Sequence, residues 1–191
     1  MNSHLPRLET ERLILRPLEM TDATNIRQLA DHPEIAANLL TMPHPYPEDG
    51  AVEFIEKMQD AINAREDFVF AITAKPSDNL IGVIGLHPRK EHHRAEIGYW
   101  LGIPFWGNGY VSEAARRVMI FGFEELGLNR IYASHFTDNP ASGKVMQKIG
   151  MTYEGTLRQH WYRWERYRDT AYYSMLREDY DALKNKTAPK G

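Results

Sequence analysis

The sequence contains no cysteine. Disulfide frameworks, thiolate metal sites and any mechanism that passes through a cysteinyl intermediate are therefore excluded. Long apolar stretches are also lacking, and no window approaches the length that spans a bilayer. The first twenty residues do not show the cationic segment and apolar run of an export signal. We expect a soluble protein in a reducing, cytoplasmic setting, with no membrane partner.

The chain has no large excess of either charge. Its formal net charge is −3, which gives no general attraction to polyanions, so we expect no nucleic-acid partner. The hydrophobic share of 42% and the charged share of 26% are close to globular averages. A chain of 191 residues can fill one core. We therefore expect a single domain over 1–184, followed by a frayed tail over 185–191.

Alternating and helical patterns predict a mixed α/β chain. Residues 12–17 alternate polar and apolar side chains and close on proline, as a half-buried strand does. Thr21 is a candidate N-cap for the first helix, and Asn139-Pro140 supplies an N-cap and a first-turn proline for a later one. The patterns predict strands over 12–17, 68–74, 80–87, 94–102 and 130–135, a two-strand hairpin within 151–176, and helices over 22–30, 48–65, 110–126, 140–150 and 177–183.

A glycine-rich junction separates the fourth predicted strand from the helix after it. Residues 104–115 read PFWGNGYVSEAA. A helix begins with unpartnered N–H groups and partial positive charge, and anions bind there. Gly107 and Gly109 lack Cβ atoms, so a phosphate or pyrophosphate can approach the N–H groups of residues 108–112. A tight turn that simply needs glycine is the alternative.

The same junction is close to a dinucleotide fingerprint. The spacing Gly107-x-Gly109-x-x-Ser112 is one residue type short of that pattern. A nicotinamide site expects an acidic residue at the end of the next strand, but the nearest acid to residues 130–135 is Asp138, beyond the strand. The chain also supplies too few strand-helix-strand units. The pattern therefore disfavours a dinucleotide.

Four runs of sequence carry a family resemblance. LETERLILRPL, AEIGYWLGIPFWGNGYVSEA, NPASGKVMQKIGMTYEG and YRDTAYYSMLREDY follow one another with spacing that resembles the GNAT superfamily of acetyl-CoA-dependent N-acetyltransferases, in its RimJ/RimL-like branch. The resemblance implies an α/β fold with a mixed, mostly antiparallel sheet, splayed between two parallel strands, and helices on both faces. It also implies acetyl-CoA in the opening, with its pyrophosphate on the helix after Gly109. Trp106 and Val111 depart from the superfamily's usual residue types.

The resemblance also assigns residues to the cofactor. Backbone groups around 101–103 would bind the pantetheine arm, and Asn139 and Ser142 match the Asn-x-x-Ser motif that contacts it. Helix capping explains Asn139 and Ser142 equally well, and Glu113 is best understood as a helix-opening acid. The predicted cofactor-binding residues are Leu101, Ile103, Trp106, Gly107, Asn108, Gly109, Tyr110, Val111, Ser112, Asn139 and Ser142.

Glu96 is the candidate general base. Acetyl transfer to an amine needs a neutral amine, and reference pKa values are ~8 for an α-amine and ~10.4 for a lysine amine, so a base is useful. Alternation places Glu96 on the strand face opposite Ile97, Tyr99 and Leu101. A carboxylate on a central strand needs a partner or a function. Arg12, Arg16 or Arg94 is a possible partner, whereas the resemblance places the catalytic glutamate at Glu96.

Two residues are candidates for the acid that protonates the departing thiolate. The resemblance makes Ser142 the first choice and Tyr153 the second. Aromatic residues in a hairpin more often pack than catalyse, which favours Ser142.

The predicted hairpin carries basic and aromatic side chains. By the resemblance, this hairpin lies beside the acceptor site, and we expect Arg158, His160, Trp161 and Trp164 to help choose the amine. A plain exposed strand is the alternative. His87, His92 and His93 lack the spacing and acidic companions of a metal site, so no metal is expected.

The sequence thus predicts an N-acetyltransferase in which an amine attacks the thioester of acetyl-CoA directly. A catalytically silent acyl-CoA sensor that uses the hairpin to bind a partner is the alternative. The acceptor, a protein N-terminus or a small amine, is not identified by the sequence. The oligomeric state is left open, a homodimer included.

Overall fold

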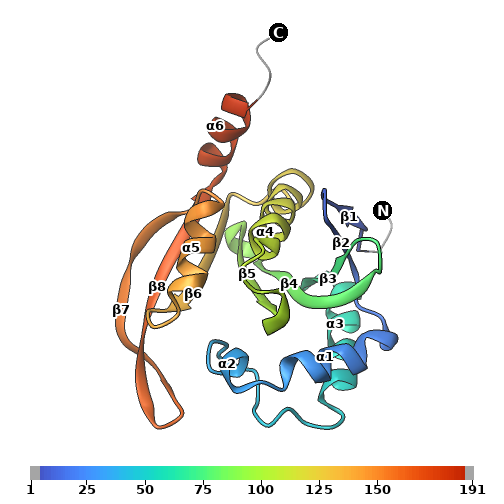
Figure 1. Ribbon diagram of the computed structural model, residues 1–191. Helices are drawn as coiled ribbons and strands as arrows, with labels where there is room; N and C mark the ends of the chain where they lie inside the picture. Colours follow the sequence, from blue (N-terminus) through green and yellow to red (C-terminus); the bar gives the residue numbers. More distant parts are fainter. Residues whose placement is uncertain (1–4, 188–191) are drawn as a thin grey trace. The chain divides into compact units, whose positions relative to one another are not determined.

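The computed structural model describes residues 5–187, which form two compact units (Figure 1). Unit 1 comprises the chain up to His87 together with Ile97–Val118. Unit 2 comprises Pro88–Glu96 together with the chain from Met119 onward.

The strands hydrogen-bond in the order β1-β2-β3-β4-β5-β6-β8-β7. β5 and β6 pair in parallel, with Arg94 opposite Arg130 and Glu96 opposite Tyr132, while the registers of β1–β4 and of β6, β8 and β7 are antiparallel. The predicted mixed, mostly antiparallel sheet is therefore confirmed. The strands are β1 Leu8–Glu9, β2 Leu13–Pro17, β3 Phe68–Ala74, β4 Asn79–Arg89, β5 Arg94–Leu101, β6 Arg130–Phe136, β7 Thr152–Arg163 and β8 Arg166–Leu176.

The helices fall close to the predicted segments. Short 3₁₀ turns, at 20–22, 90–92 and 103–105, precede α1, β5 and the glycine junction. A π-helical turn, Phe121–Glu125, continues α4. The α-helices are α1 Ala23–Ala30, α2 Pro33–Ala36, α3 Gly50–Asn63, α4 Tyr110–Ile120, α5 Pro140–Lys148 and α6 Arg177–Thr187.

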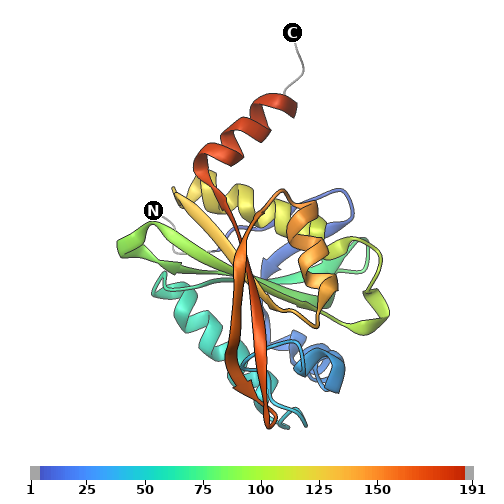
Figure 2. The ribbon, with the colours of Figure 1, turned by 90° about the vertical axis from the view of Figure 1, so that its left-hand side faces the viewer.

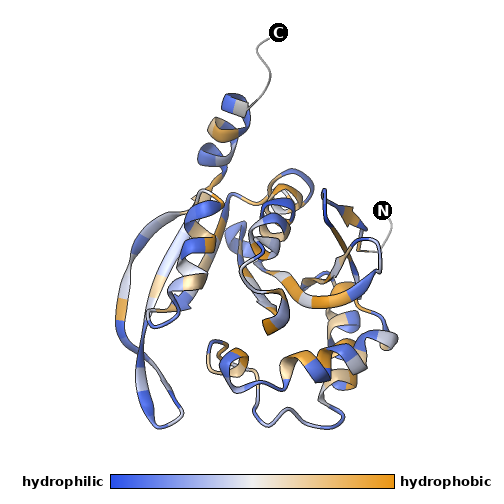
Figure 3. Cartoon of the chain, viewed as in Figure 1, coloured by the Kyte–Doolittle hydropathy of each residue, from blue (hydrophilic) through white to orange (hydrophobic). Residues whose placement is uncertain are grey.

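Unit 1 is built around an apolar core beneath β3 and β4. Helical spacing places Ile55, Met58 and Ile62 of α3 on one buried face, as predicted. α1 packs against α3, and α3 against β3. β4 is one of the most hydrophobic segments of the chain (Figure 3). The buried cluster consists of Leu18, Ile26, Ala51, Ile55, Met58, Val69, Ala71, Leu80 and Val83.

Unit 2 is a three-stranded antiparallel arrangement with helices packed on it. α5 packs against β6 and β7, and α6 against β8. β7 and β8 form the predicted hairpin and run beside each other as a long ribbon (Figure 2). β7 is mostly hydrophilic and exposed along its length (Figure 3). The hairpin therefore presents one strand to solvent and buries the other.

Three local predictions are wrong. Thr21 does not cap a helix: Asp22 occupies the N-cap position of α1 without a side-chain cap bond. Its carboxylate instead accepts the Glu19 N–H at 2.9 Å in the preceding 3₁₀ turn and pairs with Arg16. Arg16 and Asp22 are both buried, so each charge requires the other as its partner, because an unpaired buried charge is strongly destabilising. The strand β1 was missed because two residues give no periodicity.

The third correction concerns the C-terminus, where α6 continues to Thr187. The predicted frayed tail is therefore wrong for residues 185–187, and residues 188–191 lie outside the described residues. Within residues 5–187, none of the helices combines the length and hydrophobicity that a membrane span requires.

Candidate active site

The glycine junction in unit 1 adopts a conformation that requires glycine. Gly107 has φ of +79° and Gly109 has φ of +77°, values that disfavour a side chain by ~1–2 kcal/mol. A Cβ built on Gly107 would contact nothing within 4 Å, and one on Gly109 would meet only Arg12 Nη2 at 3.7 Å. The space over both glycines is therefore open, as binding of a ligand to the main chain needs.

Helix α4 begins directly after these glycines. Its first intrahelical bond runs from Glu113 N–H to Gly109 O at 3.1 Å. Within residues 5–187, no group accepts a hydrogen bond from the N–H of Tyr110, Val111 or Ser112. These three donors lie at the positive end of the helix dipole. The junction therefore has the donors and the polarity that suit a pyrophosphate.

Side chains of the loop hold its shape. The Trp106 indole N–H donates to Leu101 O at 2.7 Å, and the Asn108 amide donates to the carbonyls of Phe105 and Trp106 at 3.2 and 3.1 Å. Trp106 is nevertheless 43% exposed. Trp106 and Asn108 thus fix the path of the main chain from the end of β5 to the glycines.

A clamp from the start of β2 fastens the same loop. Arg12 donates through Nη1 to Asn108 O at 3.0 Å and through Nε to Glu113 at 2.7 Å, and its guanidinium lies 4.8 Å from the centre of the Tyr110 ring. Glu113 also accepts the Thr10 hydroxyl at 2.6 Å. We call Thr10, Arg12 and Glu113 the loop clamp. Sequence reasoning saw Arg12 only as a partner for Glu96.

The loop clamp is stable as a charged pair. Burial alone would raise the pKa of Glu113, but hydrogen bonds from Thr10 and Arg12 and the charge of Arg12 together lower it. Glu113 therefore stays ionised at neutral pH, where its charge both pairs with Arg12 and favours the start of α4.

The end of β5 offers less to a pantetheine arm than predicted. The N–H of Gly102, in the middle of the predicted donor stretch, donates to Ile81 O at 2.9 Å. The carbonyls of Leu101 and Ile103 accept from the Trp106 indole and the Trp106 N–H. The Gly102 N–H is therefore used in the contact with β4, and binding of the pantetheine arm by the main chain around Leu101 and Ile103 stays a prediction.

Glu96 lies in unit 2, at the last residue pair shared by β5 and β6. Its side chain is half-buried, and its Oε1 accepts the Ser134 hydroxyl at 3.4 Å. Of the three candidate arginines, Arg12 pairs with Glu113, Arg16 pairs with Asp22, and Arg94 lies over the ring of Tyr132. Within residues 5–187, no ion pair involves Glu96. The Glu96 carboxylate is therefore not held in place by a salt bridge.

Burial and the charge of Glu96 raise the pKa of two tyrosines in unit 2. The pKa of Tyr132 is raised first by burial and then by Glu96, and nearby arginines offset part of that rise. The pKa of Tyr172 is also raised first by burial and then by Glu96. Arg94 lies 5.6 Å from the centre of the Tyr132 ring. The glutamate thus faces two phenols that remain neutral at physiological pH.

The start of α5 fulfils its capping role. Asn139 is the N-cap, and its side chain accepts the Ser142 N–H at 3.4 Å. Ser142 is half-buried in the first turn. Tyr153 is 53% exposed, and its hydroxyl lies 2.8 Å from Thr156 Oγ1. The Tyr153 hydroxyl thus lies beside Thr156, and Ser142 lies in the first turn of α5, at the positive end of the helix.

The hairpin carries the predicted acceptor residues on exposed positions. His160 lies edge-on to Trp161 at 4.8 Å between ring centres, and Arg163 lies 5.1 Å from the Trp164 ring. Trp164 and Glu165 form the turn with φ of +49° and +58°. Both values disfavour residues other than glycine, so the turn holds Trp164 at its tip in a strained conformation.

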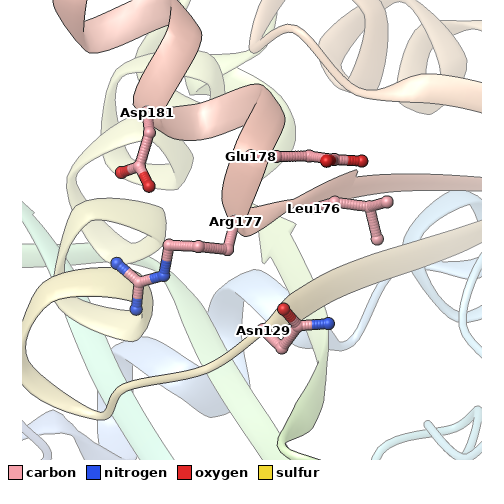
Figure 4. Close-up of a pocket in the computed structure, with 5 residues that line it drawn as sticks. All are labelled: Asn129, Leu176, Arg177, Glu178 and Asp181. Atoms are coloured by element: carbon pink, nitrogen blue, oxygen red, sulfur yellow. The ribbon is translucent and has the colours of Figure 1, made fainter.

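Two further features were candidates for part of the site: a metal-binding group of side chains and a pocket near α6. No group of three histidine, aspartate or glutamate side chains within residues 5–187 is placed to hold a metal. The pocket near α6 has Arg177 and Asp181 on one side of the helix and Glu178 on the other (Figure 4). Arg177 donates to the carbonyls of Phe123 and Leu128. The pocket thus surrounds an anchor of α6, and none of the predicted site residues lines it.

Sequence reasoning missed Ser134, Tyr172 and the loop clamp. Ser134 and Tyr172 are directly opposite each other in the register of β6 and β8. Tyr172 lies within the run YRDTAYYSMLREDY and Ser134 within none of the four runs, but their proximity becomes visible only after the strands have been paired.

A family model described as an acetyltransferase (GNAT) domain matches residues 12–152. This range contains the glycine junction, Glu96 and the start of α5. The chain therefore belongs to the GNAT family of acetyltransferases, and the predicted co-substrate, acetyl-CoA, is confirmed with it.

Similar proteins agree with the family assignment. An uncharacterized N-acetyltransferase of Bacillus subtilis, YoaA, is 35% identical over 173 residues, which are 90% of this chain and 97% of that protein. The crystal structure of a GNAT-family acetyltransferase from Bacillus anthracis has a TM-score of 0.81 at 27% identity and covers 91% of this chain and 99% of the other. The structure of RimL, a ribosomal L7/L12 α-N-protein acetyltransferase in complex with coenzyme A, has a TM-score of 0.83, at 19% identity over 90% of this chain and 98% of that one. This last likeness shows the fold alone.

Proposed function

We propose that the protein transfers the acetyl group of acetyl-CoA to a primary amine, either a protein N-terminal α-amine or a small amine, by direct attack in a ternary complex in the cytoplasm. The observation that supports the proposal most is Glu96: a half-buried carboxylate with no ion pair in the described part of the chain, held by one serine hydroxyl. Such a carboxylate is free to accept a proton.

The glycine junction supplies binding. The open main chain at Gly107 and Gly109 and the N–H groups of Tyr110, Val111 and Ser112 suit the pyrophosphate of the co-substrate. Hydrogen bonds to a charged partner contribute roughly 1.5–3 kcal/mol each. A few such donors hold the ligand without a lysine, and the loop clamp keeps them in place before binding.

Glu96 supplies the base. An amine acceptor arrives largely protonated at neutral pH, and Glu96 takes its proton, directly or through water. The neutral amine then attacks the thioester carbon. The main chain near Ile103 polarises the thioester carbonyl.

Ser142 supplies the acid. Its hydroxyl lies in the first turn of α5, where the helix dipole stabilises negative charge. The hydroxyl gives its proton to the departing thiolate and regains one from the nitrogen of the tetrahedral intermediate, which becomes the neutral amide. Tyr153 is the second candidate, although its hydroxyl already lies within hydrogen-bonding distance of Thr156.

The hairpin selects the acceptor. Trp161 and Trp164 are 38% and 48% exposed, which is unusual for tryptophan unless it meets a partner. Replacing both by alanine is expected to raise KM for good acceptors in a panel of peptides and small amines. Unchanged kinetics for every acceptor would remove this assignment.

Replacement of Glu96 by glutamine tests the function itself. Glu96→Gln keeps the shape and the Ser134 contact but removes the base, so thiol release should fall roughly 10²–10⁴-fold, while calorimetric titration with acetyl-CoA stays unchanged. Glu91→Gln, an exposed carboxylate in the turn before β5, is the matched control and should behave as wild type. A silent acyl-CoA sensor would bind acetyl-CoA but release no thiol with any acceptor.

A further inference from the structure

A line of hydrogen-bonding side chains leads from Glu96 to the exposed edge of unit 2. Ser134 donates to Glu96 Oε1 at 3.4 Å. Tyr172 on β8 is the direct cross-strand partner of Ser134. Burial and then Glu96 raise the pKa of Tyr172, and the Ser134 hydroxyl lowers it against this larger rise. The Tyr172 hydroxyl in turn lies 3.3 Å from His160 Nε2 on β7. One residue from each of four consecutive strands of the sheet, β5, β6, β8 and β7, thus takes part.

Exposure increases along this line. Glu96, Ser134 and Tyr172 are half-buried, whereas His160 is exposed. The register of the sheet brings the first two side chains together. Glu96 is paired with Tyr132 on β6, and Ser134, two residues after Tyr132, lies on the same face of that strand. Imidazole is the side chain that gains and loses protons most readily near neutral pH. The line therefore ends in solvent on a group suited to exchange protons with it.

Each member can pass a proton on. A serine or tyrosine hydroxyl both donates and accepts, and an imidazole has one nitrogen of each kind when neutral. Apo hydrogen bonds near 3.3–3.4 Å can tighten when the substrate is bound. Of the four side chains, Glu96 is the proposed base and His160 belongs to the hairpin expected to choose the acceptor, whereas Ser134 and Tyr172 have no assigned role.

We propose that Ser134, Tyr172 and His160 form a proton relay that returns Glu96 to its carboxylate form after each turnover. The inference rests on the proposed function, since it needs Glu96 to act as base. The proton taken from the amine passes from Glu96 to Ser134 while the Ser134 proton passes to Tyr172 and the Tyr172 proton to His160 Nε2. The resulting imidazolium releases one proton to solvent, and exchange with solvent returns the neutral ring to the Nδ1–H tautomer, so that Nε2 can accept again. One proton leaves, and every hydroxyl is restored.

Charged and titratable neighbours at the two ends set the pH response of the relay. Near Glu96, the phenols of Tyr132 and Tyr172 and the arginines that act on Tyr132 set the field. Near His160, Asp169 on β8 accepts the Gln159 N–H at 2.7 Å. Arg158 directly precedes Gln159 on β7. The groups involved are Arg89, Arg94, Arg130, Tyr132, Arg158, Asp169 and Tyr172.

Chemical rescue tests the relay. In a weakly buffered thiol-release assay near pH 7, His160→Ala should lower kcat at least about tenfold, a part of the roughly 10²–10⁴ that a general base supplies. Added imidazole should restore kcat in proportion to its concentration, since it can occupy the space of the missing side chain and accept the proton in its place. Tyr172→Phe should lower kcat similarly without rescue, because the line is then broken inside the protein. His92→Ala, another exposed histidine of unit 2, should match wild type.

The outcomes separate the relay from the function. Wild-type kcat in His160→Ala, or a loss that imidazole does not restore while acetyl-CoA binding shows a folded protein, overturns the relay. If Glu96→Gln keeps full turnover, the base assignment fails and the relay with it. If Glu96→Gln is inactive and His160→Ala is normal, the relay alone fails.

Discussion

The glycine junction of unit 1 and the Glu96 network of unit 2 are built in different ways. The junction uses main-chain geometry over a few consecutive residues, fixed by the loop clamp and by three side-chain hydrogen bonds, one from Trp106 and two from Asn108. The network uses one side chain from each of four strands. The co-substrate junction thus combines a local glycine motif with a clamp from the distant Thr10 and Arg12, whereas proton handling is encoded by strand pairing.

This difference predicts that the two regions can be altered separately. Changes at the junction should affect the dissociation constant for acetyl-CoA, and changes in unit 2 should affect kcat. The following variants are ordered by the size of the expected effect.

The acid assignment gives the largest effect. Ser142→Ala should lower kcat about 10²-fold if its hydroxyl protonates the thiolate, with acetyl-CoA affinity within a few-fold of wild type. Tyr153→Phe is the matched test and should change kcat less than about twofold. Steady-state thiol release checks both, and the reverse pattern would transfer the role to Tyr153.

The glycine conformation gives the next effect. Gly109→Ala must hold φ near +77°, which costs ~1–2 kcal/mol, and should weaken acetyl-CoA binding roughly 5- to 30-fold in calorimetry. Gly127→Ala is the control, since Gly127 has φ of +67° at the end of the π-helical turn and lies outside the loop. It should lower Tm similarly without weakening acetyl-CoA binding.

The loop clamp gives a smaller effect. Arg12→Met removes the bonds to Asn108 and Glu113 but keeps much of the apolar stem. Because the ion pair is half-exposed on the arginine side, we expect only about a two- to fivefold rise in the acetyl-CoA dissociation constant. Arg7→Met, at the exposed pairs with Glu9 and Asp78, should leave it unchanged.

The smallest expected effect is on stability and concerns Tyr180, which anchors α6. It can be measured only at high pH. Burial first, and then the hydrogen bond to Glu124, raise the pKa of Tyr180 to about 12. The neutral phenol is therefore favoured in the folded protein, and its contribution to stability is complete below ~10 and lost as pH rises through about 12. Thermal melts at rising pH should show this loss in wild type but not in Tyr180→Phe.

The sequence predicted those parts of the fold and site that depend on neighbours in the chain. The strand-glycine-helix junction, the Asn139 cap and the hairpin each follow from residues within one short window. The role of Asp22 was missed because it depends on Arg16, and a two-residue strand such as β1 leaves no pattern to read.

Long-range partners could not be predicted in the same way. Arg12 and Glu113 are 101 positions apart, and Ser134 and Glu96 are 38 apart. Alternation showed that Glu96 lies away from the apolar face of its strand, but it could not show which hydroxyl faces it. That contact depends on the parallel register of β5 and β6.

The most direct test of the division between binding and chemistry is the acetyl-CoA dissociation constant of Glu96→Gln, measured by calorimetry beside wild type and Gly109→Ala. We predict a value for Glu96→Gln within about twofold of wild type, and a weaker one for Gly109→Ala by the roughly 5- to 30-fold given by the strain of its backbone. Loss of acetyl-CoA binding in a folded Glu96→Gln protein would contradict the account, because it would place Glu96 in binding rather than in proton transfer.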